Sequence, residues 1–213
     1  QEPMVIASSI RKTERSSQIG QDLKQLVNRG YQLDGLVSDG GTGVVTAAQT
    51  VFPFKPHQTC LVHVHRQATL GLGRHPKDYQ LQRLKQLANH LFLIESKAAL
   101  NWWIGKVKTW ARLNQAYLNE YTHDNQRHRW WFTHPRARST LRILLGAAET
   151  SFTFLDHPLM PKTTNGIEGI FSNLRTKWQI HRGLKRKRWV SFLLWFIYFR
   201  NQQILADRKT KQA

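Results

Sequence analysis

The sequence predicts an α/β fold with parallel strand pairing, interrupted by a long helical region. Residues 3–10 and 31–39 are short, apolar segments rich in β-branched side chains, and they flank a segment with helical periodicity. A strand, a helix and a second strand in this order are typical of α/β proteins. Beyond Pro53 and Pro56, residues 78–148 show helical spacing and no convincing strand. A chain of 213 residues is long enough to bury a real core.

The first part of the chain contains two predicted strand–helix units. Residues 16–30 follow the first strand and predict a helix, because four apolar side chains recur at helical spacing before Gly30: Ile19, Leu23, Leu26 and Val27. The segment YQLDGLVSD, residues 31–39, predicts a strand buried on both faces. The glycines after it lead into a helix over residues 40–52. The segment QTCLVHVHRQATLGLG, residues 58–73, begins as a strand and continues as a helix.

The remaining chain is predicted to be helical. Residues 78–148 contain five of the eight tryptophans: Trp102, Trp103, Trp110, Trp130 and Trp131. Most of them are expected in the core, with stacking on unpaired DNA bases as the alternative. A loop with two prolines then leads to two final helices, from about Gly166 and about Lys185. The apolar run Trp189–Phe199 is shorter than the roughly 20 residues that span a membrane, so it predicts a buried helix.

The charge of the chain indicates a polyanionic partner. The formal net charge is +19 and the isoelectric point is near 10.7, which favours nucleic acid first and an anionic membrane surface second. The segment 1–59 is nearly balanced in charge, so the excess lies in the middle and C-terminal parts. The single cysteine excludes an intramolecular disulfide and indicates a reducing compartment.

A dense group of cations lies between residues 171 and 188, without any acid. We call its seven members the basic group: Arg175, Lys177, Arg182, Lys185, Arg186, Lys187 and Arg188. A solvated helix face is one explanation and a nuclear-import signal is a weaker one. Because unbalanced cations repel one another, a DNA phosphate backbone is the more natural explanation.

Two carboxylates are candidates for chemistry. Asp39 ends a predicted strand, and functional groups gather at the carboxyl ends of strands in open α/β sheets. A turn or helix-capping role is the alternative that the spacing alone favours for Asp39. Glu168 is the one acid between Asp156 and Asp207, in the first turn of a predicted helix. A capping box with Asn165 is its alternative, and spacing alone favours that alternative too.

The segment CLVH, from Cys60 to His63, raises the question of zinc. A structural zinc site normally needs four ligands, and this is the only cysteine. No second ligand pair in the sequence has suitable spacing. Cys60 and His63 are therefore predicted to have a structural role, in packing and hydrogen bonding between a strand end and a helix start.

These motifs together resemble Mutator-type transposases, which include many enzymes of bacterial insertion sequences. The resemblance rests on Asp39-Gly40, Phe52-Pro53 and Cys60-x-x-His63, and on N-x-x-E at residues 165–168 followed by a basic stretch. It covers roughly residues 3–203, and the order and spacing of the motifs are more specific than any one of them.

The resemblance implies a ribonuclease H-like fold and a DDE triad, in which two aspartates and a glutamate hold two divalent ions, Mg²⁺ or Mn²⁺. Asp39 and Glu168 would be two of these ligands. Residues 1–65 and 161–213 would form the core around an all-helical insertion at 66–160. The implied partner is double-stranded DNA at transposon ends and target sites. The resemblance also implies a homo-oligomer during the reaction, a location at the bacterial nucleoid in the cytoplasm, and no membrane.

One departure from the family pattern concerns the first aspartate. In the family it lies on the first strand of the fold, upstream of what matches here. Asp34 is five residues before Asp39 on one strand, roughly 16 Å away at 3.3 Å per residue, which is too far to share a metal pair. We therefore expect a C-terminal catalytic portion that lacks the first strand, the first carboxylate and the N-terminal DNA-binding region. The alternative function is a non-catalytic DNA-binding remnant of a truncated or domesticated transposase.

Overall fold

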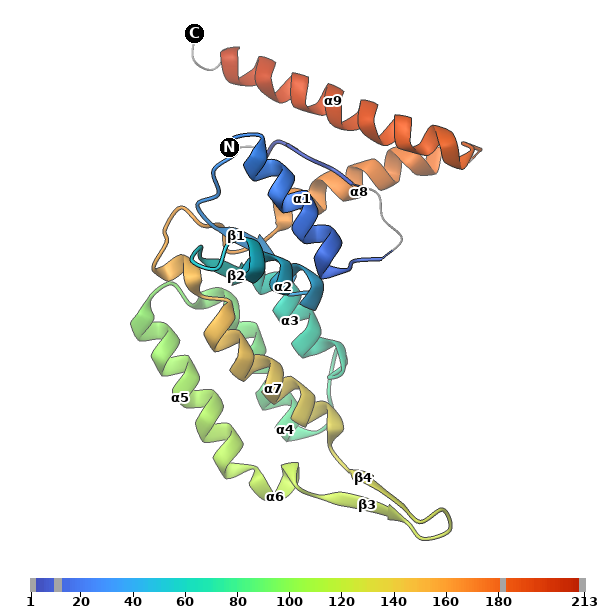
Figure 1. The fold of residues 1–213 in the computed structure, drawn as a ribbon. Helices are drawn as coiled ribbons and strands as arrows, with labels where there is room; N and C mark the ends of the chain where they lie inside the picture. The colour runs from blue at the N-terminus through green and yellow to red at the C-terminus, as the bar shows by residue number, and fades with distance from the viewer. Residues whose placement is uncertain (1–2, 10–12, 181–182, 211–213) are drawn as a thin grey trace.

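A small parallel sheet joins the two halves of the molecule in the computed structural model, which describes residues 3–9, 13–180 and 183–210 (Figure 1). Strand β1 (Leu36–Ser38) pairs with β2 (His57–Thr59). Helices α1 (Ser16–Asn28) and α2 (Thr42–Val51) pack against each other beside the sheet. An α/β layout is thereby confirmed, but the prediction of a strand over residues 31–39 that is buried on both faces was wrong, because β1 has three residues and only Ser38 among them is buried.

The parallel register of the sheet brings the two strand ends together. Leu36 pairs with His57 and Ser38 with Thr59, and the Cys60 amide donates to the Ser38 carbonyl at 2.7 Å. Because neighbouring strands lie about 4.8 Å apart, the residues that follow β1 and β2 emerge side by side at one edge. Those residues are Asp39 and Cys60.

The main hydrophobic core lies in the helical region below the sheet (Figure 1). Five α-helices build this region, with a 3-10 turn at His90–Leu93: α3 (Leu61–Leu70), α4 (Tyr79–Asn89), α5 (Lys97–Leu113), α6 (Gln115–Leu118) and α7 (Pro135–Thr150). The largest buried side chain is Trp103, whose indole N–H donates to the Leu87 carbonyl at 2.9 Å. Helix α3 starts directly after β2, so this core fixes the position of the sheet edge.

A β-hairpin extends from the helical region, and the prediction that residues 78–148 contain no strand was wrong. Strands β3 (Tyr121–Asp124) and β4 (Arg129–Phe132) pair in antiparallel fashion. In the turn between them, the Asp124 carboxylate accepts hydrogen bonds from the backbone amides of Gln126 and Arg127. The hairpin projects away from the body (Figure 1). Its strands therefore lack the alternating buried face by which a strand is recognised in a sequence.

The tryptophans of the helical region are mostly not in the core, contrary to the prediction. Trp103 and Trp110 are buried, whereas the other three are exposed: Trp102, Trp130 and Trp131. In the hairpin, Tyr121 of β3 packs across the strands against Trp130 and Phe132 of β4. Cross-strand aromatic contacts of this kind stabilise a hairpin that buries little.

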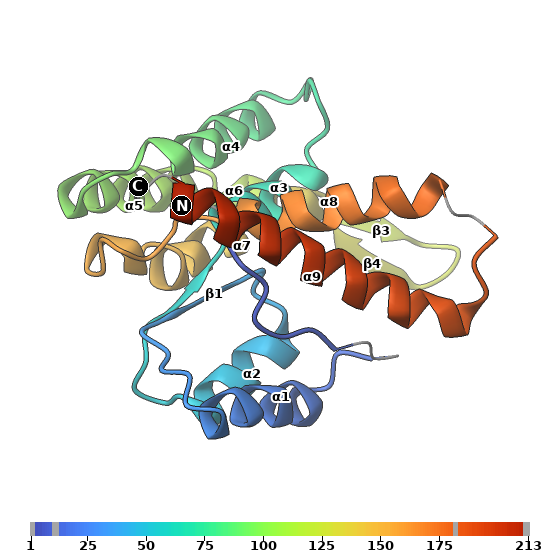
Figure 2. The same cartoon turned by 90° about the horizontal axis from the view of Figure 1, so that it is seen from above.

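Two helices close the chain as predicted, α8 (Asn165–Ile180) and α9 (Arg186–Thr210). They are joined at one end (Figures 1 and 2) and diverge from there in the view of Figure 1. Near the joined ends, the indoles of Trp178 and Trp189 meet edge-to-face at 3.9 Å between ring centroids. None of the described helices is long and apolar enough to cross a membrane.

Both closing helices are more exposed than the sequence predicted. On α8 we expected a buried stripe that included Ile167, Phe171 and Trp178, but these three are exposed and only Ile170 is buried. The expected burial of Trp189–Phe199 is also wrong, because no residue of this run is buried. The two helices lie at the top of the molecule, away from the main core, and diverge from the end where they are joined (Figure 1).

The predicted N-terminal strand is absent from the described residues 3–9, which we call the strap. The strap has no strand partner because a side chain supplies its hydrogen bonds. The Asn201 amide accepts from the Val5 N–H at 3.1 Å and donates to the Val5 carbonyl at 2.7 Å. Arg200 donates to the Pro3 carbonyl. A Cβ on Gly166 would lie 2.8 Å from Pro3, so the strap also crosses the first turn of α8.

A carboxylate at the start of α4 makes folding stability depend on pH. Asp78 caps the helix by accepting from the Gln80 and Leu81 amides, and its other oxygen accepts from the Tyr117 hydroxyl at 2.6 Å. Burial opposes ionisation of Asp78, but the Tyr117 hydroxyl and these amides outweigh burial and lower its pKa. A lowered carboxyl pKa stabilises the fold above the unfolded-state pKa of about 3.9, and this contribution is lost as pH falls through the folded pKa.

We expect Asp78→Ala, which removes the cap, to lower the free energy of unfolding at neutral pH by about 1 kcal/mol, the typical value of a helix cap. Below about pH 4 the difference from wild type should shrink, because the unfolded chain then takes up a proton at Asp78 and, at still lower pH, the folded carboxylate does too. Thermal melting across this pH range measures the effect. Tyr117→Phe, which keeps the cap, is the matched control and should reproduce part of the difference. A difference that stays constant with pH would contradict the linkage.

Candidate metal centre and nucleic-acid interface

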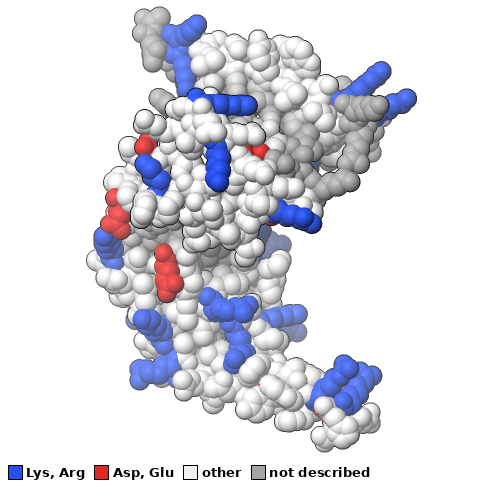
Figure 3. Space-filling model, in the orientation of Figure 1, with Lys and Arg blue, Asp and Glu red and all other residues white. Residues whose placement is uncertain are grey.

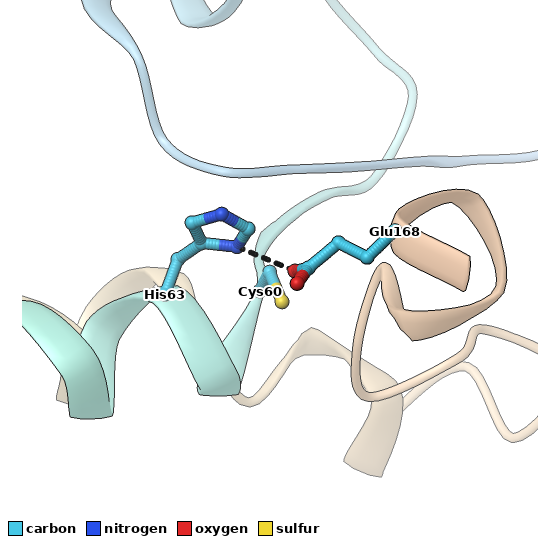
Figure 4. A group of neighbouring side chains, drawn as sticks. All are labelled: Cys60, His63 and Glu168. Atoms are coloured by element: carbon cyan, nitrogen blue, oxygen red, sulfur yellow. Dashed lines mark ion pairs between the residues drawn. The ribbon is translucent and has the colours of Figure 1, made fainter. Parts of the chain in front are cut away.

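Cys60, His63 and Glu168 converge from different parts of the chain (Figure 4). One ligand atom of each residue lies within 4.8 Å of those of the other two. The His63 Nδ1 atom lies 3.5 Å from Glu168 Oε1. Among the residues that the structure describes, this is the one group of three or more His, Cys, Asp and Glu side chains arranged so closely. We call it the Cys–His–Glu cluster.

The strand β2 and the loop before α8 hold this cluster together. The buried Gln58 side chain donates to the Pro161 carbonyl at 3.0 Å and accepts from the Phe154 amide at 2.8 Å. The Leu61 amide donates to the Lys162 carbonyl. The amide and hydroxyl of Thr164 both donate to the Cys60 sulfur at 3.3 Å. These bonds join segments far apart in the sequence, and they place Glu168 opposite the start of α3.

The electrostatic surroundings of the cluster are cationic. Arg66 Nη2 lies 3.6 Å from Glu168 Oε2, so two groups of α3, His63 and Arg66, face the single carboxylate. Burial alone would raise the pKa of Cys60, but the donors of Thr164 and the nearby His63 outweigh burial and lower the pKa to about 7. The Cys60 sulfur is buried and accepts the hydrogen bonds of Thr164, and its structural role stays a prediction.

Glu168 does not form the capping box that was its alternative role. Helix α8 begins at Asn165, whose amide donates to the Thr163 hydroxyl instead of to Glu168. The Glu168 carboxylate instead accepts from the Thr164 hydroxyl at 3.5 Å and faces α3. The side chain is half-buried, so its oxygens remain accessible to a ligand.

Asp39 lies at the predicted strand end, in the turn that was its alternative role. Its Oδ1 atom accepts from the Gly41 amide at 3.0 Å, just before α2 begins. Gly40 adopts φ 83°, and a Cβ there would lie 2.7 Å from the Thr59 side chain, so the turn needs glycine. Asp39 is exposed at the edge where Cys60 begins, but it is not a member of the Cys–His–Glu cluster.

The basic group lies on the two closing helices where it is described. Arg175 and Lys177 are exposed on α8, and Lys185 and Arg188 are exposed at the start of α9. Arg182 lies outside the described residues, as do the side chains of Arg186 and Lys187. Figure 3 shows cationic side chains towards both ends of the molecule and few acidic ones, mainly over its middle. The expected start of the last helix at the cation run is confirmed.

Sequence reasoning missed two neighbours of the candidate site, Thr164 and Arg66. Thr164 precedes α8 and donates to both Cys60 and Glu168, and Arg66 lies one helical turn after His63 on α3. Residues at positions i and i+3 lie on the same face of a helix. The spacing of His63 and Arg66 in the predicted helix could therefore have indicated that both side chains face the same site. No spacing signal links Thr164 to Cys60, because the two positions are 104 apart in the sequence.

The fold and site define an α/β protein with a carboxylate, thiol and imidazole at a sheet edge beside a basic helix pair. A family model described as "Transposase, Mutator family" matches residues 3–124, more than half of the chain. The chain belongs to the Mutator family of transposases.

A curated relative supports this family. The chain is 39% identical over 85 residues to the transposase for insertion sequence element ISRM5 of Rhizobium meliloti (strain 1021). The matched segment is 39% of this chain and 21% of the relative, so the chain spans about a fifth of the relative's length in that match. No solved structure matches the chain.

Proposed function

We propose that this chain takes part in metal-dependent DNA strand cleavage and transfer at transposon ends, and that it supplies Asp39 and Glu168 as ligands of Mg²⁺ or Mn²⁺ in a ribonuclease H-like core. The observation that supports this most is the common sheet edge: Asp39 follows β1, and Cys60, which neighbours Glu168, follows β2. This arrangement supports the proposal that Asp39 and Glu168, which are far apart in the sequence, act at one site.

The two carboxylates fit the chemistry of these ions. Asp39 keeps Oδ2 free of the turn hydrogen bond, which uses Oδ1, and Glu168 is half-exposed. Carboxylate oxygens are the ligands that Mg²⁺ prefers. A pair of such ions activates the attacking oxygen and stabilises the leaving oxygen of an in-line displacement. In this chain Arg66 and His63 would orient the Glu168 carboxylate from the side of α3.

The cationic surfaces fit a DNA backbone. The basic group continues from α8, which carries Glu168, to the start of α9. A helix start offers free backbone amides that favour phosphate, whereas cations there oppose the helix dipole and add no stability. The hairpin adds exposed indoles next to Arg127 and Arg129, a combination that suits stacking on unpaired bases.

Replacing Lys185, Arg186, Lys187 and Arg188 with glutamine should weaken binding to all duplex sequences alike. Each lost phosphate contact reduces the slope of log affinity against log salt by about 0.9. We therefore expect the slope to flatten by about 2 to 4 units, since not every cation need reach a phosphate. DNA affinity measured against salt concentration gives the slope, and thermal melting checks the fold.

Lys24→Gln with Arg29→Gln is the control for this prediction, because both residues belong to the segment 1–59, which is nearly balanced in charge. The control should keep the wild-type slope. If the quadruple variant is well folded and its slope is unchanged, the four cations at residues 185–188 face solvent and DNA binds elsewhere.

The test of the proposed function is strand cleavage of DNA that carries the element's terminal repeats, by the protein produced from its complete reading frame. We expect cleavage in Mg²⁺ or Mn²⁺ and none in a chelator. The alternative function, a non-catalytic DNA-binding remnant, predicts salt-dependent binding without cleavage under any metal. Cleavage that persists in the chelator would exclude the two-metal mechanism.

A further inference from the structure

We infer that the Cys–His–Glu cluster is a second type of metal site, which takes a thiophilic divalent ion such as Zn²⁺ through Cys60 Sγ, His63 Nδ1 and a Glu168 carboxylate oxygen. The inference concerns binding alone and does not depend on the proposed cleavage activity. It goes beyond the carboxylate chemistry proposed for Mg²⁺, because two of the three ligands are a thiol and an imidazole.

The geometry of the cluster is close to that of a bound ion. Zinc bonds of about 2.3 Å to sulfur and about 2.0–2.2 Å to nitrogen and oxygen place tetrahedral ligand atoms roughly 3.3–3.6 Å apart. The distance from His63 Nδ1 to Glu168 Oε1 is 3.5 Å, and all three ligand atoms lie within 4.8 Å of one another. Changes in side-chain rotamer that move the ligand atoms by about 1 Å would therefore bring all three within bonding distance of one ion.

An independent observation concerns His63. Its Nδ1 atom is shielded from solvent, and its contact with Glu168 Oε1 at 3.5 Å does not have the geometry of a hydrogen bond. Leaving a buried polar nitrogen unpaired costs about 1–3 kcal/mol, so most such atoms have a partner. A metal ion in the cluster would provide this partner. The same helix shows the contrast, because His65 is already engaged with Asn89 Oδ1 at 2.9 Å.

In the sequence, Cys60 and His63 have no second pair of zinc ligands at a suitable spacing. The third ligand, Glu168, comes from α8, far along the chain from Cys60, and only the fold brings it there. Three protein ligands leave the fourth position of a tetrahedral ion open to water or another ligand, unlike closed structural zinc sites, which have four protein ligands. An ion held there would also occupy the carboxylate that the proposed Mg²⁺ pair uses. That last consequence, inhibition of cleavage by Zn²⁺, rests on the proposed function.

The test is titration of the purified protein with Cd²⁺, a thiophilic probe, followed by the ultraviolet charge-transfer band of cadmium–thiolate bonds. Since the chain contains one cysteine, any such band reports Cys60. We expect one ion per chain, with affinity lowered at least about 10-fold by His63→Ala and by Glu168→Gln, because each removes one of three ligands. Zn²⁺ should displace Cd²⁺, and a large excess of Mg²⁺ should not.

His65→Ala is the matched control, and it should leave Cd²⁺ affinity unchanged. His63 and Glu168 are only half-buried, so their variants should fold, which thermal melting checks. Two results would overturn the inference: no band in the wild-type protein, or a band whose affinity is the same in wild type, His63→Ala and Glu168→Gln. The second result would mean that Cd²⁺ binds the thiol alone. Because the readout is metal binding, a protein that fails to cleave DNA can still pass this test.

Discussion

Replacing Glu168 with glutamine is expected to lower Mg²⁺-dependent strand cleavage by more than about 100-fold while leaving DNA affinity within a few-fold of wild type. Loss of a residue that merely supports a metal ligand costs about 10–100-fold in activity, so loss of a ligand itself should cost more. Glutamine keeps the shape of the side chain and its hydrogen bond from Thr164. The measurement is cleavage of end-bearing DNA, with affinity determined in parallel.

Glu149→Gln is the matched control for this experiment, since Glu149 is exposed on α7 and belongs to no candidate site. Asp39→Asn extends the experiment to the other carboxylate. An asparagine oxygen can still accept from the Gly41 amide, so the turn role survives this change while the negative charge does not. Lost cleavage with an unchanged melting temperature would separate the metal role of Asp39 from its turn role. Wild-type cleavage by Glu168→Gln would remove Glu168 from the mechanism.

Gln58→Leu should lower the free energy of unfolding by about 2–5 kcal/mol, because each group left unpaired in the interior costs about 1–3 kcal/mol. Leucine has a similar volume, but it cannot serve the Phe154 amide and the Pro161 carbonyl that the fully buried Gln58 bonds now. For a domain of this size the melting temperature should fall by roughly 5–15 °C.

Gln82→Leu is the control for this prediction, because Gln82 is exposed and bonds only the Pro76 carbonyl through its side chain. Its effect should stay within about 0.5 kcal/mol. Chemical denaturation of the three proteins at one pH provides the comparison. If the Gln58 and Gln82 variants lost equal stability, the bonds of Gln58 would not be what joins β2 to the segment before α8.

The sequence predicted features that depend on local patterns. The strand end at Asp39, the helix after its glycine turn and the start of α9 at the cation run all follow from nearby residues, and the structure confirms them. The family resemblance is also confirmed. The ribonuclease H-like fold, the three-part domain division and the roles of Asp39 and Glu168 stay predictions.

The features that sequence reasoning missed depend on tertiary contacts. The strap was predicted as a strand from its β-branched residues, but Asn201, a side chain on α9, takes the backbone bonds of Val5. The hairpin was missed because its aromatic residues pack across the two strands and not into a core. Thr164 and Glu168 lie near Cys60 because the Gln58 side chain holds the segment before α8 through hydrogen bonds to Phe154 and Pro161. The spacing of residues within one helix or strand does not predict such long-range contacts.

The strap has a consequence for the order in which the chain folds. Its bonds to Asn201 join positions 196 apart in the sequence, and closing a loop of that length costs roughly 5 kcal/mol of chain entropy. The compact helical region and the hairpin close far shorter loops, so they form first and the strap docks late. Because the strap crosses α8 at Gly166, two positions before Glu168, the surroundings of that carboxylate are completed only in this late step. A nascent chain therefore acquires its core well before it acquires a finished site.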